Sequence, residues 1–480
     1  LGYRLNYWAR HNRTLAAVEM GLVLSATGLV GTGIRDRVVA LRKEQQAREE
    51  AQLAQRLGQT VKDLEWLVRT SYLLPLHDTG YEKGIVRTRM AQIAEELTRT
   101  GEKGARLGAY VLGRGHLALH EWDAAYDQLK RAESLGYRDG ELDYALGRVL
   151  GEKYSRALDE ARKIGDKSFV EKRKKELEQE FLIPARSYLQ KSRALPTDSP
   201  SYVEALIDFY NEHYDAALLN AHMARRQTPW LYEAAKLEGD VHMVRALQQR
   251  DHGDYATAQV SFDQAVARYE EAAAVGHSDH QVHEAIAEAW IRQEEMDFYR
   301  GINPEPKMQK AQQAADHALE AEPAGPGHVK RAFAYFFAGQ YRHKSGDDNS
   351  ALRWYSEQLK QATAAISSQP LDALSHDIAG NAFKSIADIR ASRGNPDPES
   401  LLRSYNHYQI AIQINNRFPW AYNDYAGAML IEAAAKSNAN QSPTKIISEI
   451  IKTYKTALEL DRDYIYAYAG IKSTYQLQTQ

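Results

Sequence analysis

Three histidines at steps of three form the densest group of potential metal ligands in this sequence. They are His277, His280 and His283, within the stretch HSDHQVHE. Imidazole is a common ligand of Zn²⁺, but side chains three apart drift around a helix, so at most two of the three can face one ion. Asp279 is equally suited to cap the start of a helix. We therefore expect a capped helix here and assign no metal ligand in this chain.

Motifs for covalent or cofactor chemistry are missing from the sequence. Its 480 residues include no Cys, which excludes a disulfide, a thiolate zinc site and a cysteine nucleophile. The stretch HEAIAEAW (283–290) has Ala287 where H-E-x-x-H needs its second His, and no G-x-S-x-G occurs. The formal net charge of −3 gives no general attraction to nucleic acid. We expect no cofactor and no nucleic-acid partner for this chain.

A second set of side chains suits the binding of a protein or peptide ligand. Guanidinium groups can hold a carboxylate, and aromatic and amide side chains can hold a peptide by stacking and by hydrogen bonds to its backbone. In a helical repeat array whose first helices line a concave groove, the candidates that point inward are Tyr110, Arg114, Tyr144, Arg148, Tyr202, Phe209, Asp377, Asn381 and Asn423. Arg114 and Arg148 lie on adjacent repeats and can hold a carboxylate there. The alternative, that many of these residues only pack repeats together, stays open.

The elements that must position these side chains are helices. Strand patterns are almost missing, while Ala, Leu, Gln, Glu and Tyr recur at helical spacing. The clearest unit is 109–137, in which Gly113 allows close approach of a second helix that carries Ala125 and Ala132 on one face. This unit resembles the tetratricopeptide repeat (TPR), a helix–turn–helix of 34 residues. The small residue of the first helix recurs at Gly113, Gly147, Ala205, Gly239, Ala287, Ala332, Gly380 and Ala426.

Longer repeats carry insertions between their two helices. RGINPEP (300–306) and RGNPDP (393–398) each place Pro where a helix must end. The stretch 165–182, GDKSFVEKRKKELEQEFL, is typical of a charged helical extension. Insertions at the same point of successive repeats project from one side of a solenoid. They are either solvated spacers or a functional rim, and the sequence does not decide between the two.

A helical segment with a narrow apolar stripe precedes the repeats. Within residues 35–71 the apolar positions step by three and four, at Ala54, Leu57, Val61, Leu64 and Val68. Such spacing is typical of a coiled-coil stalk, and equally of an amphipathic helix that packs on the first repeat. Both alternatives stay open.

The run TLAAVEMGLVLSATGLVGTGI (14–34) predicts a single transmembrane helix. It has 21 residues, no Lys or Arg, and Glu19 as its only charge. As a helix it is long enough for a bilayer core of roughly 30 Å, with Tyr7 and Trp8 placed as interfacial aromatics. We therefore expect a single-pass membrane protein, with the side of the repeat array unresolved. Small residues four apart in this run favour pairing of two chains, so a homodimer through span and stalk is a further expectation.

The expected fold is all-α: a TPR-like α-α superhelix (solenoid) behind a single transmembrane helix and a helical stalk. Its parts are a basic juxtamembrane segment at 1–13, the span at 14–34, the stalk at 35–71, and degenerate repeats at 72–480. Because the chain opens on Leu1 rather than Met, we take it as a fragment of a longer polypeptide or as a processed form.

This order of segments resembles the region downstream of the kinase domain in bacterial membrane-anchored serine/threonine protein kinases with TPR regions. The similarity is carried by RHNRTLAAV, GLVGTG and RKEQQAREEAQLAQR, and by repeat stretches such as LGRGHLALHEWDAA (112–125), ALGRVLGEKY (145–154) and PWLYEAAKLEGDVH (229–242). The resemblance implies a ligand-sensing or protein-binding scaffold that regulates a receptor kinase. The alternative is a stand-alone TPR adaptor that assembles partner proteins.

The catalytic part of that family has no counterpart in this chain. There is no H-R-D loop and no D-F-G, and IDFYN (207–211) has Tyr210 where D-F-G needs its Gly. Gly31 and Gly33 lie inside the apolar run rather than in a phosphate loop after a strand. We expect no phosphate transfer by this chain itself, and the sequence leaves open whether a parent polypeptide is a kinase.

Overall fold

The fold is all-α within the described part of the chain. A computed structural model describes residues 10–98, 101–162, 167–193 and 199–479, together with Gly2 and Trp8, although a few side chains in these ranges, including Glu19 and 28–36, are not described. Helices and short connecting turns and loops account for these residues, and no strand occurs among them. The all-α prediction is therefore confirmed. Arg4 and Tyr7 of the expected juxtamembrane segment lie outside the described residues.

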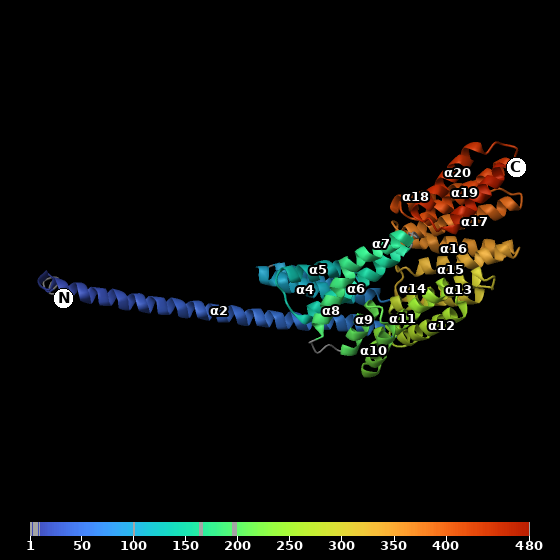
Figure 1. Cartoon of the computed structure of the whole chain (residues 1–480). Helices are drawn as coiled ribbons and strands as arrows, with labels where there is room; N and C mark the ends of the chain where they lie inside the picture. The colour runs from blue at the N-terminus through green and yellow to red at the C-terminus, as the bar shows by residue number, and fades with distance from the viewer. Residues whose placement is uncertain are drawn as a thin grey trace.

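The chain begins with one long helix, α2 (Arg13–Leu73), of 61 residues. Figure 1 shows its N-terminal part projecting from the array as a rod and its C-terminal end lying among the repeats. No boundary separates the expected span from the expected stalk, because the helix is continuous through residues 34 and 35. The side chains of Leu15, Leu22 and Leu24 on the projecting part are exposed.

The predicted membrane span is corrected by the structure. Over the described residues, no helix combines the length and the apolar character that a bilayer crossing requires. Within the run, Ser25 and Thr27 return their hydroxyls to helix carbonyls at 2.7 and 2.8 Å. The same helix then continues into residues rich in Arg, Glu and Gln. The expected membrane localisation is overturned by this finding, and the placement of Glu19 lies outside the described side chains.

The C-terminal part of α2 decides between the two alternatives for the stalk. Leu57, Val61, Leu64 and Val68 are buried in one cluster with residues of α3 (Gly80–Thr98) and α4 (Gly101–Ala118). The stripe therefore packs within the chain, on the first repeat, as an amphipathic helix does. These four side chains are not available to pair two chains in a coiled coil.

The remaining helices form antiparallel pairs. Each pair joins a first helix to a second one. The insertion at 165–182 lies between the helices of one such pair and holds α7 (Lys167–Leu177) and a π-helical turn at Glu178–Leu182. The pairs are α4 with α5 (Trp122–Ser134), α6 (Gly140–Arg162) with α8 (Ile183–Ser192), α9 (Pro200–Tyr210) with α10 (Tyr214–Gln227), α11 (Tyr232–Asp251) with α12 (Tyr255–Ala273), α13 (His280–Tyr299) with α14 (Glu305–Ala321), α15 (Gly327–Lys344) with α16 (Asp348–Ser368), α17 (Ala373–Ser392) with α18 (Pro398–Ile414), and α19 (Pro419–Asn438) with α20 (Thr444–Leu460), followed by α21 (Ile465–Gln478).

The predicted helix ends in the two Pro insertions are confirmed. After α13, Gly301 takes the left-handed conformation at φ 72°, and after α17, Gly394 does so at φ 76°. Glycine adopts this conformation without steric cost, so it ends a helix cleanly. Pro398 then opens α18, while Pro304 stands just before α14.

The small residue of each first helix lies against a large residue of its second helix. A Cβ added to Gly113 would lie 2.7 Å from side-chain carbons of Leu129, and one added to Gly380 would lie 2.6 Å from Cε1 of Tyr408. Both distances are too short for a carbon–carbon contact, so these positions require glycine. The repeat register predicted from the sequence is confirmed at both.

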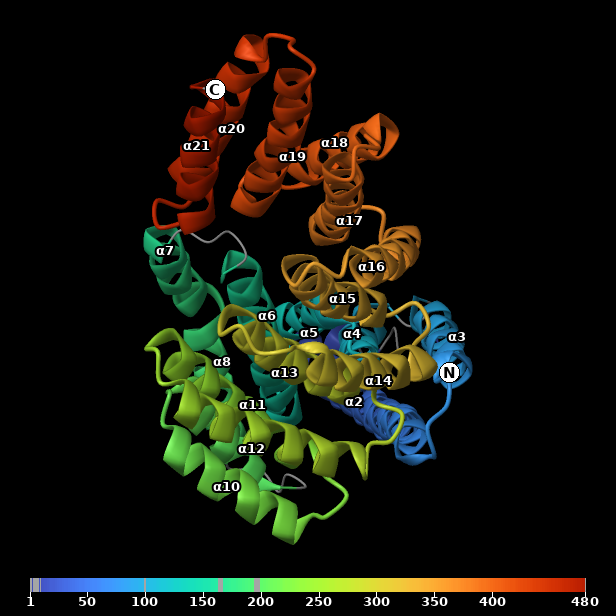
Figure 2. The ribbon, with the colours of Figure 1, turned by 90° about the vertical axis from the view of Figure 1, so that its right-hand side faces the viewer.

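First helices lie on the inner side of the superhelix. Those of neighbouring repeats contact each other, as α4–α6, α9–α11, α11–α13, α13–α15, α15–α17 and α17–α19. Successive second helices make no contacts of comparable extent within the described residues. Because first helices lie closer to one another than second helices do, the array curves with its first helices on the inside. Figure 2 shows the resulting superhelix from α4 to α21.

Candidate protein-binding face

The inner face of the first repeat already holds a carboxylate of the chain itself. Arg114 on α4 donates from Nε and Nη2 to the two oxygens of Glu65 on α2, at 2.7 and 3.0 Å. Its Nη1 donates to Tyr110 Oη at 2.7 Å and to Glu141 Oε2 at 3.0 Å. Burial opposes the charged guanidinium, but Glu65 and the neighbouring groups outweigh it and raise the pKa of Arg114. Arg114 is thus a bidentate clamp on a helix that lies in the groove.

The next repeat carries a second Tyr–Arg pair with the same spacing. The Arg148 guanidinium lies 5.9 Å from the ring centre of Tyr144 and donates to its hydroxyl at 3.3 Å. The corresponding distances from Arg114 to Tyr110 are 5.7 and 2.7 Å. A third aromatic ring, that of Tyr202, lies 5.7 Å from Arg148.

Arg148 differs from Arg114 in its anionic partner. Over the described residues, no carboxylate lies within ion-pair distance of Arg148. The carboxylate whose charge acts on Arg148 is that of Glu233, but Glu233 forms its ion pair with Arg69, at 2.5 Å. Burial opposes the charge of Arg148, yet its tyrosine neighbours and Glu233 keep its pKa above the ordinary value. The guanidinium group of Arg148 therefore faces the groove with N–H donors that have no partner among the described residues.

The candidate Phe209 lies at the end of α9 among other rings. Its ring centre is 5.8 Å from that of Tyr210 and 6.3 Å from that of Tyr214. It packs partly buried against the same core cluster as Tyr202. Its role as a binding residue stays a prediction.

The three C-terminal candidates belong to one hydrogen-bonded network. Asn381 donates to Asp377 Oδ2 at 3.2 Å and to Asp424 Oδ2 at 2.9 Å, while Asn423 donates to Asp424 Oδ1 at 3.3 Å. Lys384 neutralises Asp424 at 2.8 Å. Burial, reinforced by Asp424, raises the pKa of Asp377 well above its ordinary value. The network ties α17 to α19, and whether it also binds a partner stays a prediction.

Several residues of this face were not predicted from the sequence. Glu65 supplies the carboxylate to Arg114, and Arg69 lies 4.9 Å from the ring centre of Trp230 besides pairing with Glu233. Glu65 adjoins the apolar stripe at Leu64, which is the one local signal that it faces the array. For Arg69 and Glu233, 164 residues apart, the sequence holds no such signal.

The histidine-rich stretch has the arrangement expected for a capped helix. Asp279 precedes α13 and accepts a hydrogen bond from the backbone N–H of Gln281 at 3.0 Å. The His283 Nε2 atom lies 2.8 Å from the carbonyl oxygen of His277, and His280 pairs with Glu284. The three histidines therefore do not converge on one point.

Comparison with known proteins yields fold likeness alone. No family model and no curated protein matches the chain. A TPR protein from Thermus thermophilus is 13% identical, with 50% of this chain and 99% of that one covered and a TM-score of 0.34. A TPR protein from Parabacteroides merdae is 12% identical, covering 68% and 99%, also at 0.34. The C-terminal part of a TPR protein from Cytophaga hutchinsonii is 12% identical, covering 60% and 94%, at 0.36. Because these TM-scores are low, the TPR-like assignment rests on the helix pairs of this chain itself.

Proposed function

We propose that this chain is a protein-interaction scaffold whose inner face binds an acidic segment of a partner protein. The observation that carries the proposal is the repeated Tyr–Arg pair. Tyr110 and Arg114 hold the carboxylate of Glu65, whereas Tyr144 and Arg148, one repeat further on, have no carboxylate within the described residues.

The chemistry of the second pair favours a carboxylate from outside the chain. A guanidinium group that is half-buried and flanked by Tyr144 and Tyr202 has lost part of its hydration, so a charge-assisted hydrogen bond there is worth more than one at an open surface. Such bonds contribute about 1.5–3 kcal/mol each. The two tyrosine rings also offer apolar surface beside the charge, which is the usual composition of a binding hot spot.

Site-specific photo-crosslinking tests this proposal on the full chain. A photoreactive phenylalanine analogue replaces Tyr144, which keeps an aromatic ring at that place, and captured proteins are identified in extracts of the source cells. We expect a defined partner whose crosslinked segment contains Asp or Glu, and a loss of capture of roughly 10–100-fold in R148Q, from the bond energy above.

Arg353 provides the matched control. It stacks on Trp354 at 5.3 Å, as an Arg–aromatic pair on the second helix α16. R353Q is expected to leave capture unchanged. Capture that survives R148Q, or that falls equally in R353Q, would contradict a carboxylate site at Arg148.

The resemblance to kinase tails supports a more specific form of this proposal. In that form the scaffold belongs to a serine/threonine protein kinase, and the bound partner regulates it. The projecting part of α2 would then connect the repeats to the kinase domain. The sequence of the reading frame upstream of Leu1 tests this directly. A frame without kinase motifs would leave the stand-alone adaptor as the function.

A further inference from the structure

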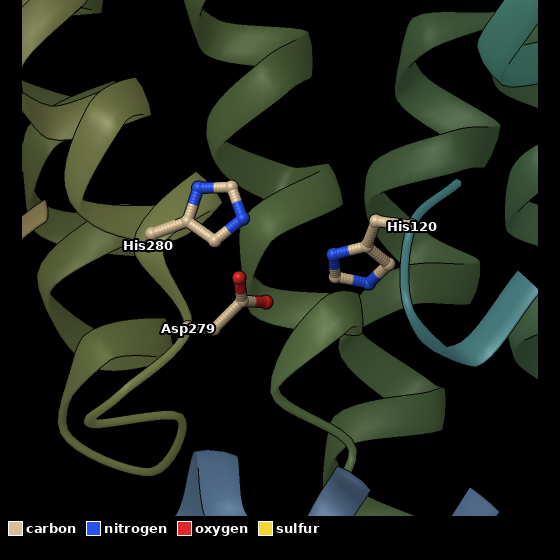
Figure 3. Close-up of side chains that lie close together, drawn as sticks. All are labelled: His120, Asp279 and His280. Atoms are coloured by element: carbon tan, nitrogen blue, oxygen red, sulfur yellow. The ribbon is translucent and has the colours of Figure 1, made fainter. Parts of the chain in front are cut away.

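Three potential metal ligands from distant parts of the chain converge beside the start of α13. His120 comes from the turn between α4 and α5, and Asp279 and His280 come from the α12–α13 junction. One ligand atom of each lies within 4.8 Å of the others. Figure 3 shows the two imidazole rings facing one another, with the carboxylate of Asp279 between and below them.

His280 is oriented as metal-binding histidines commonly are. Its Nδ1 lies 2.8 Å from Glu284 Oε1, so Nδ1 carries the proton that the carboxylate accepts. In the neutral ring the lone pair is then on Nε2, the nitrogen that points toward His120 in Figure 3. A carboxylate behind the imidazole fixes the tautomer and makes the ligating nitrogen more basic.

The Nδ1 atom of His120 is free to bind a metal ion. This atom is buried and has no hydrogen-bond partner within the described residues, and it faces His280. The ring is fixed between Tyr72 and Trp122, stacked at centroid distances of 5.6 and 5.2 Å. A ring that is held in place with one nitrogen unpaired is well suited to bind a metal ion.

His120 occupies a turn position that recurs through the array. It takes the left-handed conformation at φ 60°, in the turn that ends a first helix. Four later repeats have glycine in that turn, at Gly253, Gly301, Gly346 and Gly394, and two have another residue with a Cβ, Glu212 and Asn440. A residue with a Cβ is less stable there than glycine, so the imidazole is held at a cost in backbone energy.

We propose that His120, Asp279 and His280 bind one divalent transition-metal ion, for which Zn²⁺ is the best fit. Two imidazole nitrogens and one carboxylate oxygen suit Zn²⁺, whereas Mg²⁺ and Ca²⁺ prefer oxygen ligands alone. Ligand atoms of a tetrahedral zinc site are about 3.3 Å apart, so the present separations of up to 4.8 Å shorten by at most about 1.5 Å around the ion. Water or a partner side chain takes the fourth position.

The bound ion would tie two repeats that are not neighbours. Asp279 is also held by the Tyr232 hydroxyl at 2.9 Å, so the carboxylate is already oriented by α11. A ligand that binds the folded chain alone stabilises it by mass action. The ion therefore acts as a cross-link between the α4–α5 turn and the α12–α13 junction.

Metal titration of the full chain tests this proposal. Zn²⁺ is titrated in competition with a chromogenic chelator, and Co²⁺ is added separately to record the visible bands of a tetrahedral site. We expect one ion per chain and a rise in Tm of at least about 3 °C with saturating Zn²⁺. Loss of one ligand in H120A or H280A should weaken binding by roughly 100-fold or more.

Two further variants separate metal binding from folding. D279N keeps a side-chain oxygen for the cap of α13 but weakens the ligand, so it should fold normally and lose the Zn²⁺-dependent rise in Tm. H213Q changes a histidine that is 67% exposed on another repeat and should bind as the unaltered chain does. Absence of one-to-one binding, or equal binding by the unaltered chain, H120A and D279N, would overturn the site.

Discussion

The Arg114–Glu65 clamp helps to hold α2 on the inner face, and a double-mutant cycle measures how much it contributes. The change is Arg114→Leu with Glu65→Gln, singly and together. The two hydrogen bonds of 2.7 and 3.0 Å join side chains that are 12% and 30% exposed. This places the pair between a surface salt bridge, worth at most about 1 kcal/mol, and a fully buried one, whose disruption costs about 3–5 kcal/mol. We expect a coupling energy of about 2 kcal/mol.

Hydrogen exchange of the α2 amides at 57–73 is the suitable assay. Repeat arrays do not unfold as two-state systems in general, so a local opening free energy is better defined than a global one. With Glu65 present, loss of Arg114 should speed exchange in this segment by roughly 30-fold, the factor that about 2 kcal/mol implies. In a chain that already carries E65Q, the same loss should have a much smaller effect.

The pair Arg48–Glu44 on the projecting part of α2 is the control. Its side chains are 75% and 57% exposed, so its coupling should be about 0.3–0.5 kcal/mol. A coupling for Arg114–Glu65 no larger than this would refute the clamp. It would also remove the ground for proposing that Arg148 awaits a carboxylate, because that proposal extends the same chemistry by one repeat.

Two further predictions concern packing and pH. Gly380→Ala places a Cβ 2.6 Å from Tyr408 and should lower the local opening free energy of α17 and α18, measured by hydrogen exchange, by about 2 kcal/mol or more. Gly427→Ala, with no atom closer than 3.7 Å, should be neutral or stabilising, and equal effects would contradict the repeat packing. Burial, together with His376, lowers the pKa of His407 to about 4, so stability should fall as pH falls from about 6.5 to 4, where only the unfolded chain binds the proton. Because His407 is partly solvated, the loss should be about 1–2 kcal/mol, and His407→Gln should remove this part of the pH dependence; an unchanged dependence would place its cause elsewhere.

The helix pairs could be predicted because their signals are local. Gly113 and Gly380 face large residues of their own repeat, and Gly301 and Gly394 end helices within a few residues of a proline. A pattern of this kind needs no knowledge of the rest of the chain. The same is true of Asp279, whose capping role depends on the next two residues alone.

The position of α2 could not be predicted in the same way. An apolar stripe at Leu57, Val61, Leu64 and Val68 fixes which face of the helix is buried, but a coiled-coil partner and a repeat satisfy it equally well. The run at 14–34 similarly indicated a long apolar helix without indicating that it continues unbroken into the segment that packs on α4.

The candidate site shows the same limit. The repeat register placed Arg114 and Arg148 on the inner face, yet which of them already holds a carboxylate depends on where Glu65 comes to lie. In the histidine cluster, Asp279 and His280 are adjacent in sequence, whereas His120 is 160 residues away from His280. Long-range geometry of this kind follows from the curvature of the superhelix, which small contributions from every repeat determine together.

The 69–83 segment gives this superhelix contacts that a simple solenoid lacks. A repeat ordinarily touches only its neighbours, so its curvature is free to vary. Here Arg69 pairs with Glu233, the backbone N–H of Ser278 donates to the carbonyl of Tyr72 at 3.0 Å, and that of Thr79 donates to Ala321 at 3.1 Å.

These contacts join the end of α2 and the loop after it to two later repeats, α11–α12 and α13–α14, across 164 to 242 residues. Because they close long loops, they form only when all the intervening repeats are folded and correctly curved. The end of α2 therefore couples the stability of repeats that are not adjacent. It also fixes the distance between the inner-face residues of the first repeats and those of α11 and α13. Both proposed sites, the carboxylate site at Arg148 and the metal site at His120, depend on this distance.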